Sequence, residues 1–174
     1  MLWLGLVAAC GGGSGGGGCP DFATITGGTF TRTGTDLVWT LDVAAISTVT
    51  FNQATVPDNV LEYRWGIDLD SNGDGSTDLR VAATHFKPPA AAEVTTADVL
   101  SQTQEDVWQV MSNGAASAVG NVTVTLAGNR FTFATNDRED AALAAVTDVA
   151  QSTWKTNYFE GPNFDDQCDD SFRP

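Results

Sequence analysis

The sequence has few basic residues, a single histidine and little cysteine. Its 174 residues include 8 Lys and Arg against 22 Asp and Glu, which gives a formal net charge of −14. Binding to nucleic-acid phosphates or anionic lipid headgroups depends on clustered Lys and Arg, so we expect neither. The lone His85 leaves little for acid–base or triad catalysis. Phosphate-loop, nucleophile-elbow, histidine-rich zinc and CxxC motifs are absent as well, so we expect no enzyme.

The sequence does contain enough apolar material for one domain core. Hydrophobic residues make up 42% of the chain, including five Trp and nine Phe. No segment after the N-terminal region approaches the roughly 20 apolar residues of a membrane span.

Residues 1–18 differ in composition from the rest of the chain. The stretch from Leu6 to Gly11, Leu-Val-Ala-Ala-Cys-Gly, resembles the lipobox of bacterial lipoproteins. The resemblance implies a signal peptide over residues 1–9, lipidation of Cys10 and a cell-envelope location, with the lipid as the contact to the membrane. The glycine run in residues 11–18 predicts a flexible tether. An ordinary secretory signal, a chance match and an engineered linker are the alternatives.

The chain has three cysteines, an odd number that leaves one cysteine of an exported protein without a disulfide partner. If Cys10 carries lipid, Cys19 and Cys168 are left to pair, and a disulfide between them would close residues 19–174 into one domain. Loop-closure entropy gives such a bond on the order of 4–5 kcal/mol. The alternative is two unpaired thiols, which an oxidising compartment disfavours.

Apolar and polar residues alternate along most of the chain, which is typical of antiparallel strands with one buried face. We expect strands around residues 28–32, 37–43, 46–51, 61–69, 79–83, 108–110, 122–126, 131–133 and 154–158. Gly128-Asn129 predicts a two-residue hairpin turn. Residues 136–146 combine capping residues with an alanine-rich run, which predicts one short helix. The expected fold is an all-β, antiparallel two-sheet β-sandwich.

An acidic segment predicts a calcium site. Counted from Asp70, side-chain oxygens fall at positions 1, 3, 5, 7 and 9, with glycine at position 6, which is the ligand spacing of EF-hand-type loops. Val81 stands where the bidentate glutamate belongs, so we expect weak, structural binding. The alternative is a solvated acidic turn. The expected ligands are Asp68, Asp70, Asn72, Asp74, Ser76 and Asp78.

The strand from Tyr63 to Asp70 with the loop after it resembles the aromatic strand and acidic loop of DOMON-like and family-nine carbohydrate-binding-module-like sandwiches. The loop also resembles those of dockerins and thrombospondin-type repeats. These resemblances imply a jelly-roll-type sandwich that binds sugars or haem, or that serves as an adhesion or spacer module. For haem the chain offers only His85 and Met111 as axial ligands, and we expect both to be structural.

Sugar binding needs exposed aromatic platforms. Trp39, Trp65 and Trp108 alternate in phase with apolar residues, so we expect them in the core. Trp154 has polar neighbours and is the predicted platform, together with Tyr158. The acidic segment 165–170 predicts a solvated tail or a second weak cation site.

The expected function is therefore non-catalytic. The leading hypothesis is a lipid-anchored binding module with a structural calcium loop and a carbohydrate ligand. The alternative is a structural, protein-interaction or adhesion module without a small ligand, and haem binding or hydrolysis is a remote alternative.

Overall fold

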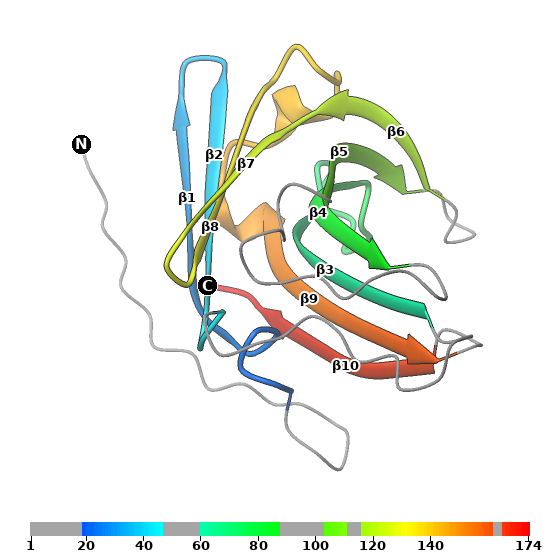
Figure 1. Ribbon diagram of the computed structural model, residues 1–174. Helices are drawn as coiled ribbons and strands as arrows, with labels where there is room; N and C mark the ends of the chain where they lie inside the picture. The colour runs from blue at the N-terminus through cyan, green and yellow to red at the C-terminus, as the bar shows by residue number, and fades with distance from the viewer. Residues whose placement is uncertain (1–18, 47–59, 88–102, 111–115, 162–164) are drawn as a thin grey trace.

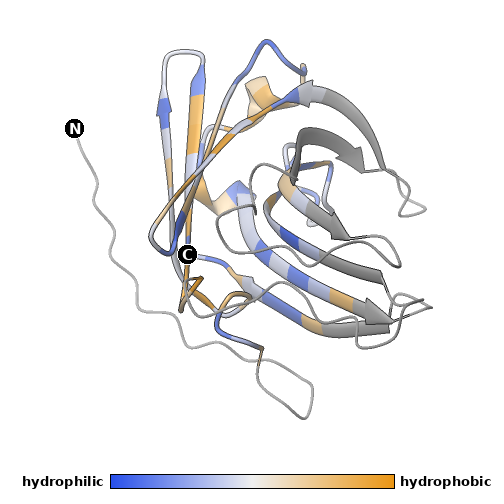
Figure 2. Cartoon of the chain, viewed as in Figure 1, coloured by the Kyte–Doolittle hydropathy of each residue, from blue (hydrophilic) through white to orange (hydrophobic). Residues whose placement is uncertain are grey.

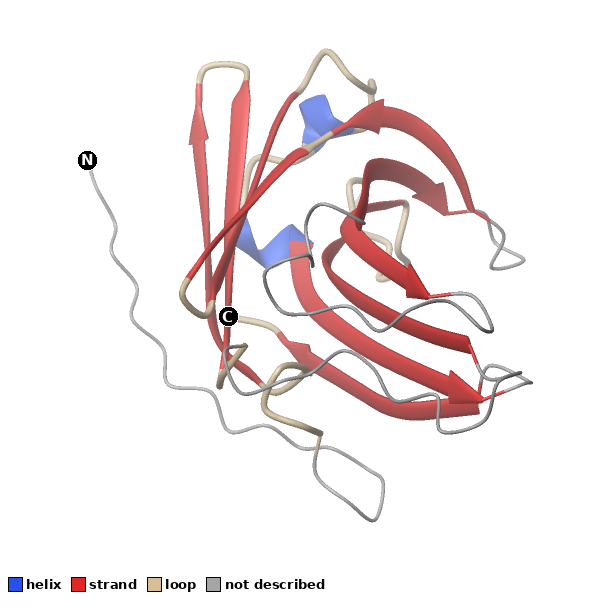
Figure 3. Ribbon diagram, viewed as in Figure 1, coloured by secondary structure: helices blue, strands red, loops and turns tan. Residues whose placement is uncertain are grey.

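A computed structural model describes residues 19–46, 60–87, 103–110, 116–161 and 165–174 (Figure 1). Strands dominate this part of the chain, and its helical elements are two 3₁₀ turns, η3 (Leu143–Ala145) and η4 (Val149–Gln151), drawn blue in Figure 3. The described strands are β1 Ile25–Thr33, β2 Asp36–Val43, β3 Val60–Leu69, β4 Leu79–Lys87, β5 Thr103–Val110, β6 Ala116–Asn121, β7 Thr123–Ala127, β8 Arg130–Asn136, β9 Ser152–Gly161 and β10 Asp165–Phe172.

The strands form two antiparallel sheets. One has four strands in the order β1-β2-β8-β7, and the other has six in the order β10-β9-β3-β4-β5-β6. Most neighbours in a sheet are consecutive in sequence, and the exceptions are the β2–β8 and β3–β9 pairs at the middle of each sheet. The predicted all-β, two-sheet β-sandwich is confirmed.

Alternation of apolar and polar residues produces the two inner faces. On β2 every second side chain from Leu37 to Val43 is buried, and on β3 the apolar residues at alternate positions, Tyr63, Trp65, Ile67 and Leu69, are buried in the core. Phe131 and Phe133 complete the centre of the core from β8. Figure 2 shows the corresponding alternation of hydropathy along the strands. A strand whose side chains point alternately to opposite faces buries one such set against the facing sheet.

Two tryptophans connect the sheets through reciprocal hydrogen bonds. Trp39 Nε1, on β2, donates to Ser152 Oγ on β9 at 3.0 Å. Trp154 Nε1, on β9, donates to the carbonyl oxygen of Thr40 on β2 at 2.6 Å. Each bond satisfies a buried indole N–H, which would otherwise be costly in the core. Together they fix β2 of one sheet against β9 of the other.

The predicted turn between β7 and β8 is confirmed. Ala127 pairs with Arg130, which leaves Gly128-Asn129 as a two-residue loop, and Gly128 adopts a φ of 60°. Asn129 also accepts a hydrogen bond from the Ile46 N–H and donates one to the Ala44 carbonyl. The turn residue therefore anchors the chain that leaves β2.

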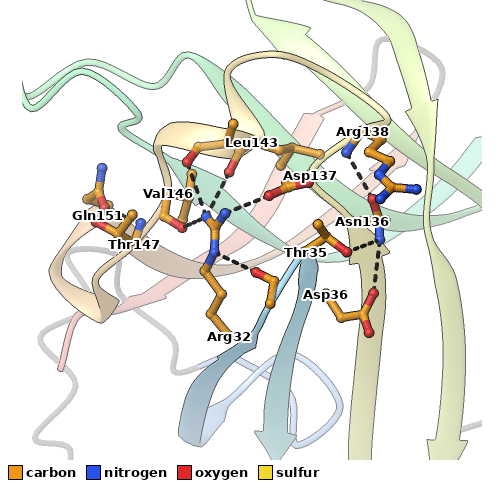
Figure 4. A network of polar contacts seen from close by, with 12 residues as sticks. Arg32, Thr35, Asp36, Asn136, Asp137, Arg138, Leu143, Val146, Thr147 and Gln151 are labelled. Atoms are coloured by element: carbon orange, nitrogen blue, oxygen red, sulfur yellow. Dashed lines mark hydrogen bonds and ion pairs between the residues drawn. The ribbon is translucent and has the colours of Figure 1, made fainter.

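The predicted helix over residues 136–146 is wrong, because Asn136 ends β8 and only η3 is helical. Arg32, on β1, explains the difference: its Nη1 donates to the carbonyl oxygens of Leu143, Ala144 and Val146, and its Nη2 lies 2.6 Å from Asp137 Oδ2 (Figure 4). Carbonyl groups that bond to a guanidinium in this way favour a tight turn over a continuing helix.

The acidic segment predicted as a tail is strand β10, which pairs with β9 along Asp165–Phe172. Its aspartates have low strand propensity, so the alternation pattern did not reveal it. Asp170 Oδ2 accepts the backbone N–H of Ile25 at 2.8 Å, and Asp169 lies 3.5 Å from Lys155. Strand β6 was also missed. The expected strand over residues 46–51 lies almost wholly outside the described residues.

The Cys19–Cys168 disulfide is confirmed. It joins the segment before β1 to the middle of β10, with a Cα–Cα distance of 5.4 Å and a sequence separation of 149 residues. The bond therefore closes the described domain at both ends. Cys10 and the glycine tether lie outside the described residues.

Removing this bond should destabilise the fold strongly. For a loop of this length the chain-entropy estimate is about 5 kcal/mol of unfolding free energy. We expect reductant, or the double substitution Cys19→Ser/Cys168→Ser, to lower the melting temperature by about 10–20 °C in scanning calorimetry. The double variant is its own control, since reductant should leave it unchanged. Equal melting temperatures with and without reductant in the wild-type chain would contradict a stabilising role of the disulfide.

Candidate functional site

The segment between β3 and β4 forms a compact loop centred on Asp70. Its Oδ1 accepts the N–H groups of Gly73 and Asp74 at 2.7 and 3.1 Å, and its Oδ2 accepts that of Gly75 at 2.8 Å. Gly73 and Gly75 have φ values of 77° and 89°, a backbone region that L side chains rarely adopt. Both glycines are therefore required by the turn itself.

Further side chains in the loop bond to its own backbone. Asn72 Oδ1 accepts the Asp74 N–H, and Asp74 Oδ1 accepts the Ser76 N–H, both at 2.8 Å. Asp78 closes the loop, since its Oδ2 accepts from the N–H and Oγ of Ser71 and its Oδ1 from Asn72 Nδ2. The side-chain oxygens at alternate positions of the loop thus point into it, and many of them already accept hydrogen bonds from backbone N–H groups.

Asp68, the first of the predicted calcium ligands, is not bonded to this loop and is paired with Arg80 instead. It pairs directly with Arg80 across β3 and β4, and the two carboxylate oxygens accept Nε and Nη2 at 2.6 and 2.8 Å. The Asp68 side chain is 8% exposed. A carboxylate held by a bidentate guanidinium in a nearly buried position is neutralised by that partner.

The remaining predicted ligands meet the chemistry of calcium only in part. Asp70, Asn72, Asp74, Ser76 and Asp78 supply hard oxygens in one short loop, as calcium requires. Within the described residues, however, no three Asp, Glu, His or Cys side chains gather closely enough to hold a metal ion. Calcium binding would require the loop carboxylates to exchange some N–H donors for the ion.

Trp154 is not an exposed platform, and this prediction is wrong. Its side chain is 0% exposed, its indole donates to Thr40, and its ring packs on Phe172. Polar neighbours in the sequence, Thr153 and Lys155, occupy the opposite face of β9, so Trp154 belongs to the inward-pointing set.

Tyr158, the other predicted platform residue, packs against the aromatic core. It is half-buried, stacks on Tyr63 with ring centroids 5.1 Å apart, and meets Phe22 edge-on at 5.5 Å. Trp39 and Trp65 are buried as predicted. The side chains of Trp108 and His85, and the whole of Met111, lie outside the described residues.

The outer face of the four-stranded sheet carries a surface that sequence reasoning missed, here called the threonine face. One row across the strands reads Thr29, Thr40, Thr132 and Thr125, and the next reads Thr31, Val38, Ala134 and Thr123. Thr29 Oγ1 and Thr40 Oγ1 are hydrogen-bonded at 2.8 Å. The Thr-x-Thr spacing in β1 and β7 was the available signal, but its meaning depended on knowing which strands are neighbours.

Charged residues flank the threonine face at the ends of its strands. Asp36 lies at one end, and the Asp42–Arg130 ion pair at 2.6 Å lies at the other. The hydrogen bonds that Arg130 donates to Asp42, and then the negative charge of Asp42, raise the pKa of Arg130. Such an exposed pair contributes about 0–1 kcal/mol. The two rows themselves carry no charge, on a chain with a net charge of −14.

Comparison with protein-family models, with curated proteins and with solved structures finds no match to this chain. In the part of the chain that the structure describes, no helix has the length and apolar character needed to cross a bilayer.

Because the Trp154 indole lies against Gly28, alanine substitutions at the adjacent glycines Gly27 and Gly28 should differ in their effect on stability. A Cβ on Gly28 would lie 2.4 Å from Trp154 Nε1, whereas a Cβ on Gly27 would meet only Asp42 Oδ2 at 3.7 Å. We expect Gly28→Ala to lower the unfolding free energy by about 1–3 kcal/mol in denaturant titration, because the buried indole must shift. Gly27→Ala, the matched control, should stay within about 0.5 kcal/mol of wild type. Equal effects would show that Trp154 is loosely held.

Proposed function

We propose that this chain is a non-catalytic surface module of the cell envelope that contacts a protein partner through its threonine face. The lipobox-like residues around Cys10 and the glycine run after it support display at the end of a lipid-anchored tether. The observation that carries the proposal is the threonine face itself, an uncharged surface on a strongly acidic chain. Depletion of charge is a compositional mark of the centre of protein interfaces.

Carbohydrate binding becomes the second candidate. Its leading position depended on an exposed aromatic platform, but Trp154 is fully buried and Tyr158 is half-buried against the core. The hydroxyl row of Thr29, Thr40, Thr132 and Thr125 still favours it as an alternative, since threonine hydroxyls can donate to and accept from sugar hydroxyls.

A photocrosslinking amino acid placed on the threonine face tests the two candidates. We expect a benzophenone side chain at Thr125 to crosslink to a discrete protein in producing cells, and the same group at Ser171 on β10 to give no such product. Both positions are exposed, so accessibility is matched. Equal crosslinking from both positions would contradict the proposal. Saturable binding to a glycan array that Thr125→Lys abolishes would establish the second candidate instead.

Within this function we assign the loop of residues 70–78 a structural calcium role. Five oxygen-bearing side chains at alternate positions support it, and so do the two glycines that allow the turn. We leave Asp68 out of the proposed ligand set, because its carboxylate is paired with Arg80. The ion would stiffen the connection between β3 and β4, two strands at the middle of the six-stranded sheet.

Calorimetric titration with calcium checks this role. We expect a dissociation constant on the order of 10⁻⁴–10⁻³ M, because a bidentate carboxylate is missing. At tenfold excess over that value the melting temperature should rise by about 3–6 °C. Asp74→Ala should abolish both effects, and Asp21→Asn, an exposed acid away from the loop, should preserve them. Neither heat nor a raised melting temperature in millimolar calcium would refute calcium binding.

A further inference from the structure

The side-chain amide of Asn157 is buried and has no hydrogen-bond partner among the described residues. Asn157 lies on β9 and is 9% exposed. The other buried polar residues in the described part of the chain, Asp68, Ser152 and Thr156, are all hydrogen-bonded. Burying an amide without a partner costs stability, so the position of Asn157 calls for a reason other than folding.

The Asn157 amide lies on the outer face of the six-stranded sheet. Its neighbours along β9 point into the sandwich, where Thr156 donates to the Ala23 carbonyl and Tyr158 stacks on Tyr63. Successive side chains of a strand point to opposite faces, so Asn157 points outward. Strand β9 lies between β3 and β10 in this sheet (Figure 1), and both neighbouring strands contribute to the surroundings of the amide.

Four side chains flank the amide on this face. Arg64 on β3 and Asp169 on β10 lie directly opposite Asn157 in the register. Lys155 and Phe159, two residues away in either direction, share its face and are partly exposed. Hydrogen-bond donors, an acceptor and an aromatic ring are thus arranged around one unpaired amide.

This cluster is accessible from the β10 side. The side chains of Lys155 and Asp169 are 31% and 45% exposed, and their charged atoms lie 3.5 Å apart. An exposed ion pair at this distance contributes little to stability. It can therefore open at little cost when a ligand contacts Asn157.

The charges of the cluster favour a neutral ligand. An anion would meet Asp169 on a chain with a net charge of −14, and a cation would meet Arg64 and Lys155. An amide needs a ligand that both donates and accepts hydrogen bonds, and hydroxyl groups do both. The apolar face of a sugar ring can in addition pack against an aromatic ring such as that of Phe159.

We propose that Asn157 marks a binding site for a neutral saccharide on the outer face of the six-stranded sheet. The Asn157 amide bonds to sugar hydroxyls, and the sugar ring packs on Phe159. The site is on the other sheet from the threonine face and its hydroxyl row. It therefore goes beyond the proposed protein contact and does not depend on it.

Nuclear magnetic resonance titration of the full chain with Cys10→Ser, which prevents lipid attachment, tests the proposal. Glucose, galactose, mannose and N-acetylglucosamine are added singly up to about 100 mM, because a small contact surface gives millimolar dissociation constants. At least one sugar should shift the Asn157 side-chain resonance saturably, while the Trp154 indole resonance on the opposite face stays in place. Binding should persist in Thr125→Lys, which alters only the threonine face. If none of the four sugars gives a saturable shift, water alone occupies the site and the proposal is overturned.

Melting temperatures provide an independent check. Asn157→Leu removes an unpaired amide at nearly constant shape, so it should raise the melting temperature by about 2–5 °C and abolish the sugar-induced shifts of neighbouring backbone amides. Thr156→Val, the matched control at the adjacent residue, removes a buried hydroxyl that has a partner and should lower the melting temperature. A lower melting temperature in Asn157→Leu would show that the amide is structurally paired and would overturn the proposal. Sugar-induced shifts that survive this substitution would overturn it as well.

Discussion

The reciprocal pair of tryptophan hydrogen bonds between β2 and β9 is the constraint on which the sandwich depends. Trp39 reaches from the four-stranded sheet to Ser152, and Trp154 reaches back to Thr40. Water is kept from these bonds only if each indole ring is fully enclosed, and this requires small residues beside the rings. Gly28 leaves room for the Trp154 indole, and Ser152 is completely buried beneath Trp39. Directional bonds between otherwise non-directional apolar layers fix how one sheet sits on the other.

Alternation in the sequence was sufficient to predict the two-sheet fold and the burial of the tryptophans of β2 and β3. Turn propensity predicted the Gly128-Asn129 turn, and the cysteine count predicted the disulfide. It failed where a distant partner overrode local preference. Arg32 binds the carbonyls of residues that favour a helix, and β9 with Cys19 holds four aspartates of β10 in a strand. At the candidate site, alternation correctly places Trp154 inward, whereas its polar neighbours misled the prediction toward a surface role. The pairing of Asp68 with Arg80 was not predicted, because Arg80 is twelve residues away in sequence.

The aromatic and acidic residues therefore have other roles than their positions in the sequence suggested. The buried tryptophans stabilise the sandwich, and the acidic loop organises the β3–β4 turn through its own N–H groups. The surface proposed to contact a partner is the threonine face, whose two rows carry no charge. Net negative charge elsewhere favours solubility and limits non-specific contacts, so an uncharged face is suited to a selective contact.

Hydrogen exchange at the Trp154 indole N–H tests most directly whether this tryptophan is structural. Its resonance can be assigned in a nitrogen-15 spectrum by comparison with Trp154→Phe. The account predicts that this N–H exchanges only through global unfolding, as slowly as that of Trp39, and that adding glycans leaves its chemical shift unchanged. Rapid exchange at the rate of an exposed indole, or a shift of that resonance on glycan binding, would contradict it.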